Sequence, residues 1–349
     1  MQKVTCINCR KKFINYDFVH EGKKNYSSHY CNDCVKSIRE ARPLVGYHGF
    51  NDWKPRRLDG QTYCLYIGFE LEVGGLRNTT NINKKMRTIC ENVEKIMDYD
   101  VICSKDSSIN SGFEIVSQPM TVEYMLKYKD RFIKLFDYLK KMGLKDDDSC
   151  GLHFHVNKNF IHNDEGTINR IYLIMENFKK ELFKFSRRDK DNINRWSKFL
   201  LDTNEDDNKI QQKKKNRLGT RKINDSKDYG DRYMALNITN ISTLEFRLFK
   251  STLDIRTFFS AVELVANIMF MARENVVRQL IGANFKKLLT YKYNNYCLDY
   301  AKRKNIPMIR NVIFDYDTFK KSQKDIVIKK LKGIDKSIVE DILRYYERT

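Results

Sequence analysis

The chain has 349 residues, of which 41% are hydrophobic and 32% are charged, and its 65 basic and 45 acidic residues leave a net charge of +20. This length predicts about two domains, and 21 phenylalanines with 20 tyrosines exclude a disordered basic tail. No signal-peptide segment is evident, and no run approaches the roughly 18–20 apolar residues of a membrane span. We therefore expect a soluble, cytoplasmic protein without a membrane partner, whose nine cysteines stay reduced or bind metal.

The positive charge is concentrated at the two ends of the chain. Residues 1–60 contain 12 basic and 6 acidic residues, and residues 261–349 contain 18 basic and 10 acidic residues. The 200 residues between them are nearly balanced, with 35 basic and 29 acidic residues. These basic residues permit a contact with a nucleic acid or an acidic protein. The alternatives are a solvated face and, for the C-terminal region, a contact with another subunit or domain.

The first 42 residues contain two Cys-x-x-Cys pairs, which have the spacing of a four-cysteine zinc site. Too few residues are present to bury a core, so a structural Zn²⁺ would supply much of the folding free energy. Because four thiolates fill the coordination sphere, this zinc is not expected to be catalytic. The alternatives are a disulfide or redox module, or a site in which His20 or His29 replaces one cysteine. The four predicted ligands are Cys6, Cys9, Cys31 and Cys34.

Composition divides the remainder of the chain into three parts. Residues 43–60 combine prolines and glycines with polar residues and are predicted to form a linker. Residues 61–275 are predicted to form the main domain. Residues 276–349 form a basic C-terminal region, in which lysines alternate with apolar residues and predict short helices.

Four segments of the main domain alternate apolar and polar residues, as strands buried on one face do. They are YCLYIGFELEV at 63–73, GFEIVSQP at 112–119, CGLHFHV at 150–156 and STLEFRLF at 242–249. In the first strand, Leu71 and Val73 are predicted to face the core. The opposite faces carry acids, histidines and an arginine, namely Glu70, Glu72, Glu114, His153, His155, Glu245 and Arg247.

These polar side chains have the composition of a divalent-metal site. A single such strand is often an edge strand with one wet face, and a lone histidine is usually a satisfied core residue, but four such strands indicate a shared site. Carboxylates with an imidazole suit Mg²⁺ or Mn²⁺ better than zinc. Arg247 beside Glu245 offers a clamp for phosphate oxygens. The residues alone therefore predict a metal site on a sheet, suited to phosphoryl transfer.

The ordered motifs GFELE, GFEIVS, CGLHFHV and LEFR resemble those of the amidoligase family, within the glutamine-synthetase-like superfamily. The resemblance covers roughly residues 60–275, including RYMALN at 232–237 and the STLD that follows the last strand. It implies an α+β fold, in which a curved antiparallel sheet forms half a barrel with helices on its outer face. The four-cysteine module and the C-terminal region lie outside the resemblance.

The same resemblance implies ATP and Mg²⁺ or Mn²⁺ as cofactors and assigns roles to individual residues. By similarity, His155 would lie toward the nucleotide, and Arg232 and Arg247 toward the phosphates as catalytic groups. The ammonia-site acid of glutamine synthetases has no counterpart that we can identify, so ammonia is not expected as the amine. The metal ligands implied by similarity are Glu70, Glu72, Glu114, His153 and Glu245.

The implied reaction is the ATP-dependent joining of a carboxylate to an amine. A carboxylate becomes a good electrophile once the γ-phosphoryl group of ATP is transferred to it, and an amine can then displace phosphate from the acyl phosphate. Metal ions would offset the charges that repel each other in the first step, and Asp106 is a candidate for binding or deprotonating the amine. The sequence leaves open whether the substrates are small molecules, peptides or proteins.

Three helices and one polar loop are also predicted in the main domain. Apolar residues recur at helical spacing over residues 121–142, 169–185 and 257–271, and these stripes are predicted to pack against the sheet. Residues 202–230 are polar and rich in lysine, which predicts either a solvated loop or a lid over the site.

Two other functions remain open at this point. One is a zinc-ribbon protein that binds nucleic acid and has an inactive ligase-like domain. The other is a small-molecule kinase on the same type of sheet, which would stop at phosphoryl transfer. An amide product formed together with ADP and phosphate would distinguish the ligase from both.

Overall fold

The structure is a computed structural model that describes residues 53–76, 82–105, 109, 112–146, 149–191, 193, 197–199, 233–276, 279–280 and 283–309. For residues 3–5, 12–14, 44–45 and 82–84 it describes the backbone alone. Several predictions fall outside these residues: the four-cysteine site, Asp106, Arg232, the loop at 202–230 and the helices at the C-terminal end.

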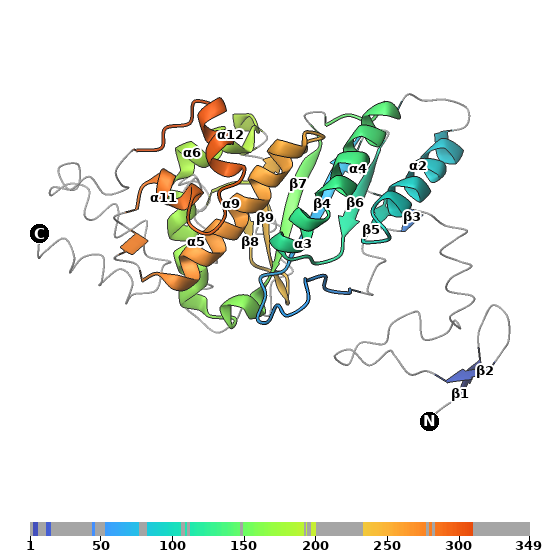
Figure 1. Cartoon of the computed structure of the whole chain (residues 1–349), viewed down its shortest axis with the longest axis horizontal. Helices are drawn as coiled ribbons and strands as arrows, with labels where there is room; N and C mark the ends of the chain where they lie inside the picture. The colour runs from blue at the N-terminus through green and yellow to red at the C-terminus, as the bar shows by residue number, and fades with distance from the viewer. Residues whose placement is uncertain are drawn as a thin grey trace, which may run out of the picture.

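A seven-stranded sheet forms the centre of the fold (Figure 1), with the strand order β3-β5-β6-β4-β7-β9-β8. Six of these strands pair antiparallel, and only β3 pairs in parallel, with β5. The strands are β3 (Leu44–Val45), β4 (Ile67–Val73), β5 (Val101–Ser104), β6 (Phe113–Ser117), β7 (Gly151–Asn157), β8 (Leu236–Asn237) and β9 (Thr243–Lys250). The α+β class with an antiparallel sheet is therefore confirmed. A separate pair, β1 (Lys3–Thr5) and β2 (Lys12–Ile14), lies near the N-terminal end of the sequence.

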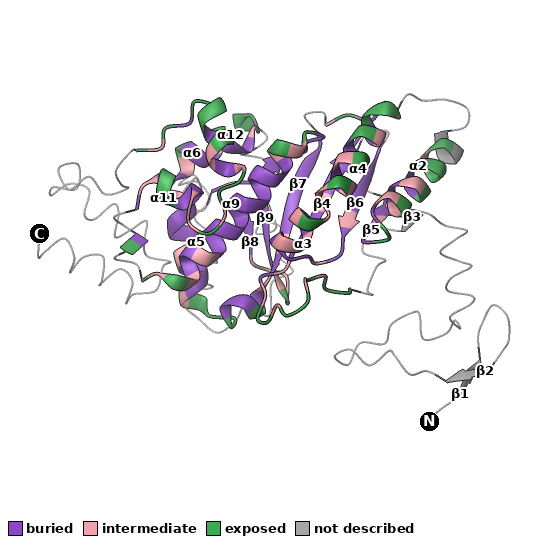
Figure 2. Ribbon diagram, viewed as in Figure 1, coloured by how far each residue is buried: buried purple, intermediate pink, exposed green. Residues whose placement is uncertain are grey.

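The apolar residues of the central strand face the helices. Leu71 and Val73 have no exposed surface, as predicted, and Phe69 is 1% exposed. The ring of Phe69 packs 6.0 Å from that of Phe132 and 5.2 Å from that of Phe258. One face of the sheet is thus covered by α2 (Ile82–Ile96), α4 (Lys129–Lys141) and α9 (Ile255–Glu274), and Figure 2 shows the buried strands beneath the exposed outer sides of α2 and α4.

Two of the predicted helices are each divided in two. In place of one helix over 121–142, α3 (Val122–Lys127) is followed by α4, with Tyr128 between them. The Tyr128 ring packs 4.6 Å from that of Tyr124 and carries the Arg131 guanidinium at 4.3 Å, which stabilises the break. Similarly, α5 (Glu165–Asn177) and α6 (Lys179–Ser186) meet at the buried Phe178. A continuous apolar stripe does not reveal such breaks, because both halves face the same core.

By length and composition alone, the central helix α9 could cross a membrane. This corrects the expectation that no segment is apolar enough to do so. However, 78% of its most apolar window is buried inside the fold. Asp254 caps its first turn by accepting a hydrogen bond from the Thr257 backbone at 2.8 Å. Burial of this extent is typical of a helix in the core of a fold.

Residues from the predicted C-terminal region pack on α9. The buried Glu263 carboxylate accepts hydrogen bonds from the backbone N–H groups of Asn295, Tyr296 and Cys297 at 2.8–3.1 Å. Asn267, one turn further along, accepts from Lys292 and Tyr293. These contacts hold α11 (Phe285–Leu289) and α12 (Cys297–Arg303) beside α9.

Candidate functional site

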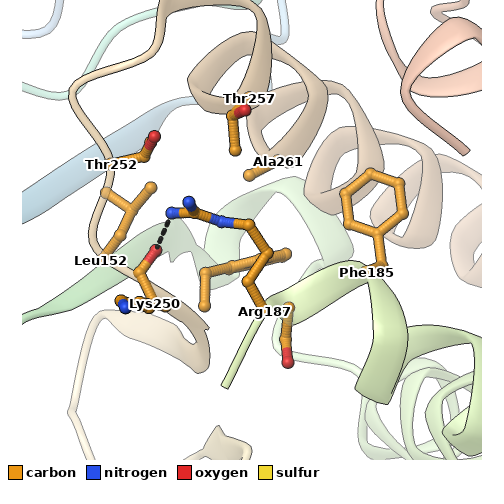
Figure 3. Close-up of a pocket in the computed structure, with 9 residues that line it drawn as sticks. Leu152, Phe185, Arg187, Lys250, Thr252, Thr257 and Ala261 are labelled. Atoms are coloured by element: carbon orange, nitrogen blue, oxygen red, sulfur yellow. Dashed lines mark hydrogen bonds between the residues drawn. The ribbon is translucent and has the colours of Figure 1, made fainter. Parts of the chain in front are cut away.

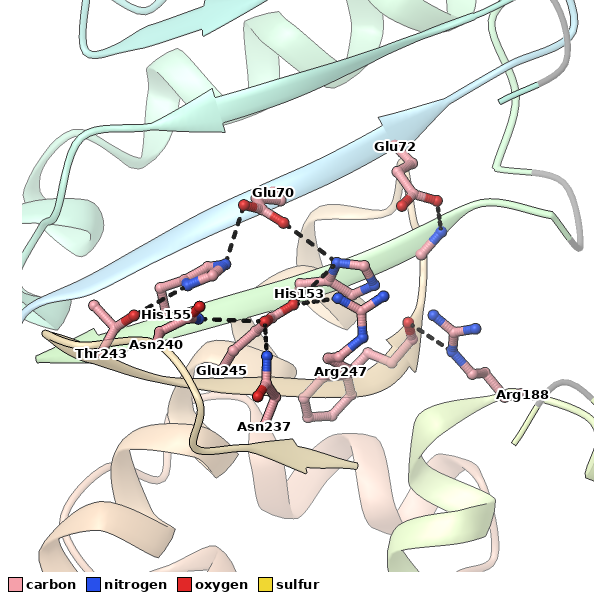
Figure 4. A network of polar contacts seen from close by, with 12 residues as sticks. Glu70, Glu72, His153, His155, Arg188, Asn237, Asn240, Thr243, Glu245 and Arg247 are labelled. Atoms are coloured by element: carbon pink, nitrogen blue, oxygen red, sulfur yellow. Dashed lines mark hydrogen bonds and ion pairs between the residues drawn. The ribbon is translucent and has the colours of Figure 1, made fainter. Parts of the chain in front are cut away.

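The register of the sheet brings the polar residues of four strands together on one face. Glu72 lies directly opposite Glu114, and Glu70 directly opposite His153. In the same way, His155 lies opposite Glu245. Because directly opposite residues of antiparallel strands share a face, these side chains gather on the side of the sheet away from α4 and α9 (Figure 4).

Two carboxylates and an imidazole form the densest part of this face. One ligand atom each from Glu70, His155 and Glu245 lies within 4.8 Å of the other two. His155 Nε2 is 3.1 Å from Glu70 Oε1. His153 Nδ1 is 3.4 Å from the other oxygen of Glu70 and 3.8 Å from Glu245 Oε1. Both histidines therefore contact the carboxylates.

The carboxylates keep His155 protonated. Burial alone would lower the pKa of His155, but Glu70 and Glu245 outweigh it and raise this pKa to about 9. Burial would raise the pKa of Glu70, yet His155 and His153 hold it well below its usual value. The pKa of Glu245 is also lowered against the effect of burial, by His155 and then Arg247. The proton on His155 thus balances part of the charge of the two carboxylates, and a divalent cation would have to displace it, because an imidazole ligates through a deprotonated nitrogen.

The donor atoms of this cluster fit a divalent metal ion. Within the described part of the chain, the buried Nε2 of His155 has no hydrogen-bond partner despite its approach to Glu70. A buried nitrogen that faces two carboxylates, one of which is its ion-pair partner Glu70, can become a ligand atom once it loses its proton. Two carboxylates with one imidazole are a donor set that Mg²⁺ and Mn²⁺ accept.

Amide and hydroxyl groups from the turn between β8 and β9 support the cluster. Asn237 Nδ2 donates to Glu245 Oε2 at 2.8 Å, and Asn240 Nδ2 lies 3.4 Å from the same oxygen. Thr243 Oγ1 lies 3.4 Å from His155 Nδ1. The buried Lys158 fixes this turn by donating to the carbonyl oxygen of Asn240. None of these supporting residues was predicted as part of the site, although Asn237 ends the RYMALN motif.

A β-bulge lies between the cluster of Glu70, His155 and Glu245 and the other end of the site. Phe154 of β7 pairs with Phe246 of β9, but Leu152 pairs with Phe249, so two residues of β9 oppose one residue of β7. One of these two residues is Arg247, whose guanidinium donates to Glu245. Bulges redirect side chains in this way at functional sites.

Two further carboxylates lie beyond the bulge. Glu72 and Glu114 are 7% and 5% exposed and stand opposite each other on adjacent strands. Glu72 Oε2 accepts a hydrogen bond from the Gly151 N–H at 2.5 Å.

Arg188 is a buried residue of the site that the sequence did not reveal. It follows α6, is 9% exposed, and donates from Nε to the Phe249 carbonyl at 3.1 Å. Burial lowers its pKa to about 10, and the nearby Glu72 partly opposes that shift. Because Arg188 lies in a connection without periodic pattern, only its position in the fold identifies it.

The adjacent Arg187 points the other way. It donates to the Ser251 carbonyl and lines a cavity of about 10 Å³ on the helix side of the sheet (Figure 3). A volume of this size holds no more than about one water molecule, so this cavity is not the site of a nucleotide.

A sequence model of the family described as "Putative amidoligase enzyme" matches residues 78–269. The match spans more than half of the chain and contains Glu114, His153, His155, Glu245 and Arg247, whereas β4 with its two glutamates precedes it. No curated protein and no solved structure matches the chain. The chain belongs to the amidoligase family.

Proposed function

We propose that the protein is an ATP-dependent ligase that joins a carboxylate to an amine through an acyl phosphate. The observation that carries the proposal is the cluster of Glu70, His155 and Glu245 on the face of the sheet away from α4 and α9, in a chain that belongs to the amidoligase family. The arrangement of one sheet face covered by helices and one face bearing acids is consistent with a glutamine-synthetase-like half barrel.

Mg²⁺ or Mn²⁺ would be held by Glu70, His155 and Glu245, with His153 beside them. Glu72 and Glu114 offer a second position for a cation. A metal ion bound there supplies charge that offsets the repulsion between ATP and an anionic substrate. The chain's own groups keep the donors in place, because Asn237 orients Glu245 and Thr243 lies beside His155.

The reaction would proceed in two displacements. A carboxylate oxygen attacks the γ-phosphorus of ATP, and the bond to ADP breaks as the acyl phosphate forms. The amine nitrogen then attacks the acyl carbon, loses a proton and displaces phosphate. Arg247 is suited to stabilise the phosphoryl oxygens. Arg232 is proposed for the same task, and Asp106 for receiving the proton of the amine.

The ends of the chain are proposed to have a separate role. A structural Zn²⁺ held by the four cysteines would fold the N-terminal module, and the basic ends would recruit an acidic protein or a nucleic acid in the cytoplasm. The carboxylate and amine substrates can then be small molecules, peptides or proteins.

The test is incubation of the full chain with ATP, Mg²⁺ and pools of carboxylates and amines, followed by product mass and phosphate release. The ligase predicts ADP, phosphate and a new amide in equal amounts. A kinase on the same sheet would yield ADP and a phosphorylated product without amide. Absence of ADP with every pool, together with salt-sensitive binding of nucleic acid, would support the zinc-ribbon alternative instead.

A further inference from the structure

Two consecutive arginines after α6 point to opposite sides of the sheet. Arg187 has a left-handed backbone, with φ of 63°, and caps the helix. Its side chain turns toward the helix face, where it donates to the carbonyls of Lys250 and Ser251 (Figure 3). The side chain of Arg188 reaches the site instead (Figure 4). Arg188 therefore places a positive charge in the site, and the neighbouring Arg187 provides a control position outside it.

Gly151 makes room for the Arg188 guanidinium. A Cβ atom at Gly151 would lie 2.6 Å from Arg188 Nη2 and 2.7 Å from His153 Nε2, closer than such atoms approach in proteins. Because Gly151 has no side chain, the Arg188 guanidinium and the His153 imidazole can both lie against β7 at this position. The Gly151 N–H is used as well, because it donates to Glu72.

The positive charges at this end of the site are incompletely paired. Arg188 uses its Nε for the Phe249 carbonyl, and its outer nitrogens make no hydrogen bond or ion pair with the residues that the structure describes. Arg247 donates to Glu245, but its buried Nε has no partner among the same residues. Burial lowers the pKa of Arg188 most, and the positive charge of Arg247 lowers it further against the opposing effect of Glu72.

Glu245 pairs with Arg247 and Glu72 lies near Arg188, but several donors of the two guanidinium groups have no acceptor among the described residues. Buried donors without acceptors are unfavourable unless a ligand accepts their hydrogen bonds. A guanidinium with free outer nitrogens is suited to bind two oxygens of one anionic group. We propose that Arg188 and Arg247 form a subsite for an oxyanion, meaning a carboxylate or a phosphoryl group, at the Gly151 end of the sheet face. This inference rests on the proposed function for its role, which is to hold the acid substrate or the phosphoryl group that it receives.

Direct binding of two probes tests the subsite without ATP. Isothermal titration of the full chain with inorganic phosphate and, separately, with glutarate measures affinity for each kind of oxyanion. Binding of either probe is expected, and competition between the two assigns which oxyanion the subsite prefers. Wild-type protein that binds neither probe overturns the proposal.

Three variants locate the binding. Arg188→Gln is expected to weaken binding of the preferred probe at least tenfold, whereas the control Arg187→Gln binds as the wild type does. Gly151→Ala keeps both arginines but places a methyl group against the guanidinium, and it is expected to weaken binding as well. Circular dichroism verifies that each variant is folded, and Gly151→Ala decides the question if Arg188→Gln is not.

Equal binding by Arg188→Gln and wild type overturns the subsite, and so does an equal loss in Arg187→Gln. This outcome is distinct from failure of the proposed function. If no substrate pool yields an amide but phosphate or glutarate binding still depends on Arg188, the subsite stands and the ligase reaction does not. If the wild type forms an amide but Arg188→Gln does not change probe binding, the ligase reaction stands and the subsite does not.

Discussion

His155 reaches Glu70 diagonally across two strands, with 3.1 Å between Nε2 and Oε1. On β4, the residue directly opposite His155 is Gly68, which has no side chain to intervene. A Cβ at Gly68 would have 3.7 Å to its nearest neighbour, so there is room for a methyl group. The diagonal contact therefore depends on a small residue at position 68, and so does the cluster of Glu70, His155 and Glu245.

Position 68 predicts a graded effect on metal binding. Gly68→Ala is expected to bind Mn²⁺ as the wild type does, because the methyl group makes only ordinary contacts. Gly68→Leu should weaken Mn²⁺ binding at least about tenfold by displacing the imidazole. Electron paramagnetic resonance of free Mn²⁺ in a titration measures both. Equal affinity of the leucine variant and the wild type would show that His155 and Glu70 do not share an ion.

Support for the cluster from Asn237 predicts a further loss. Asn237→Ala removes the hydrogen bond to Glu245 and is expected to lower Mn²⁺ affinity by about 10–100-fold. The matched control is Asn159→Ala, since Asn159 is exposed and lies outside the cluster. An unchanged Mn²⁺ titration for Asn237→Ala would remove Glu245 from the ligand set.

Turnover is predicted to require the residues at both ends of the site. Glu72→Gln and His153→Ala should each abolish amide formation and leave the circular dichroism spectrum unchanged, because neither packs in the apolar core. The control is Glu91→Gln on the exposed side of α2. The assay requires an acid and an amine that the wild type joins. If both site variants retain activity with these substrates, the site assignment is wrong.

Glu263 predicts a large effect on stability rather than on chemistry. Glu263→Ala leaves the buried N–H groups of Tyr296 and Cys297 without an acceptor. Hydrogen bonds to a buried charge contribute about 1.5–3 kcal/mol each, so urea unfolding should show a loss of roughly 3 kcal/mol or more. Glu274→Ala, at the exposed end of the same helix, should change stability by less than about 0.5 kcal/mol. Similar losses for the two variants would contradict the role of Glu263 in holding α12.

Glu94 predicts a dependence of stability on pH. Burial raises the pKa of Glu94 from 4.5 to about 7, so ionisation is less favourable in the folded protein than in the unfolded chain. The free energy of unfolding therefore falls as the pH rises from about 4.5 to about 7. Above pH 7 Glu94 is ionised in both states, so its contribution no longer changes with pH. Glu94→Gln stays neutral and should become more stable relative to the wild type between pH 5 and pH 8, as measured by urea midpoints. A difference that does not vary with pH would contradict the assignment.

The predicted zinc site can be tested on the full chain by elemental analysis. One tightly held zinc per chain is expected, and Cys6→Ser should release it because three thiolates leave the tetrahedron incomplete. Zinc-free wild-type protein purified under reducing conditions, with no uptake of added Zn²⁺, would exclude the module.

The alternation of apolar and polar residues predicted which strand residues face the core. It did not predict the functional residues in the connections between strands and helices. Leu71 and Val73 could be assigned to the core because alternate residues of a strand face opposite sides. The register that brings Glu70 beside both histidines could not be predicted, because strand pairing depends on residues that are distant in the sequence. Arg188 lies in a loop, and Asn237 lies in a two-residue strand that is too short for any periodic pattern. Their roles become visible only through the side chains that surround them.

The central claim is that a carboxylate oxygen attacks ATP before the amide forms. The most direct measurement uses a pool of acids whose carboxylates carry oxygen-18, with ATP, Mg²⁺ and amines, followed by mass analysis of the released phosphate. An acyl phosphate predicts one labelled oxygen in each phosphate released, together with ADP and amide. Unlabelled phosphate, or AMP with pyrophosphate in place of ADP, would contradict the mechanism proposed for this protein.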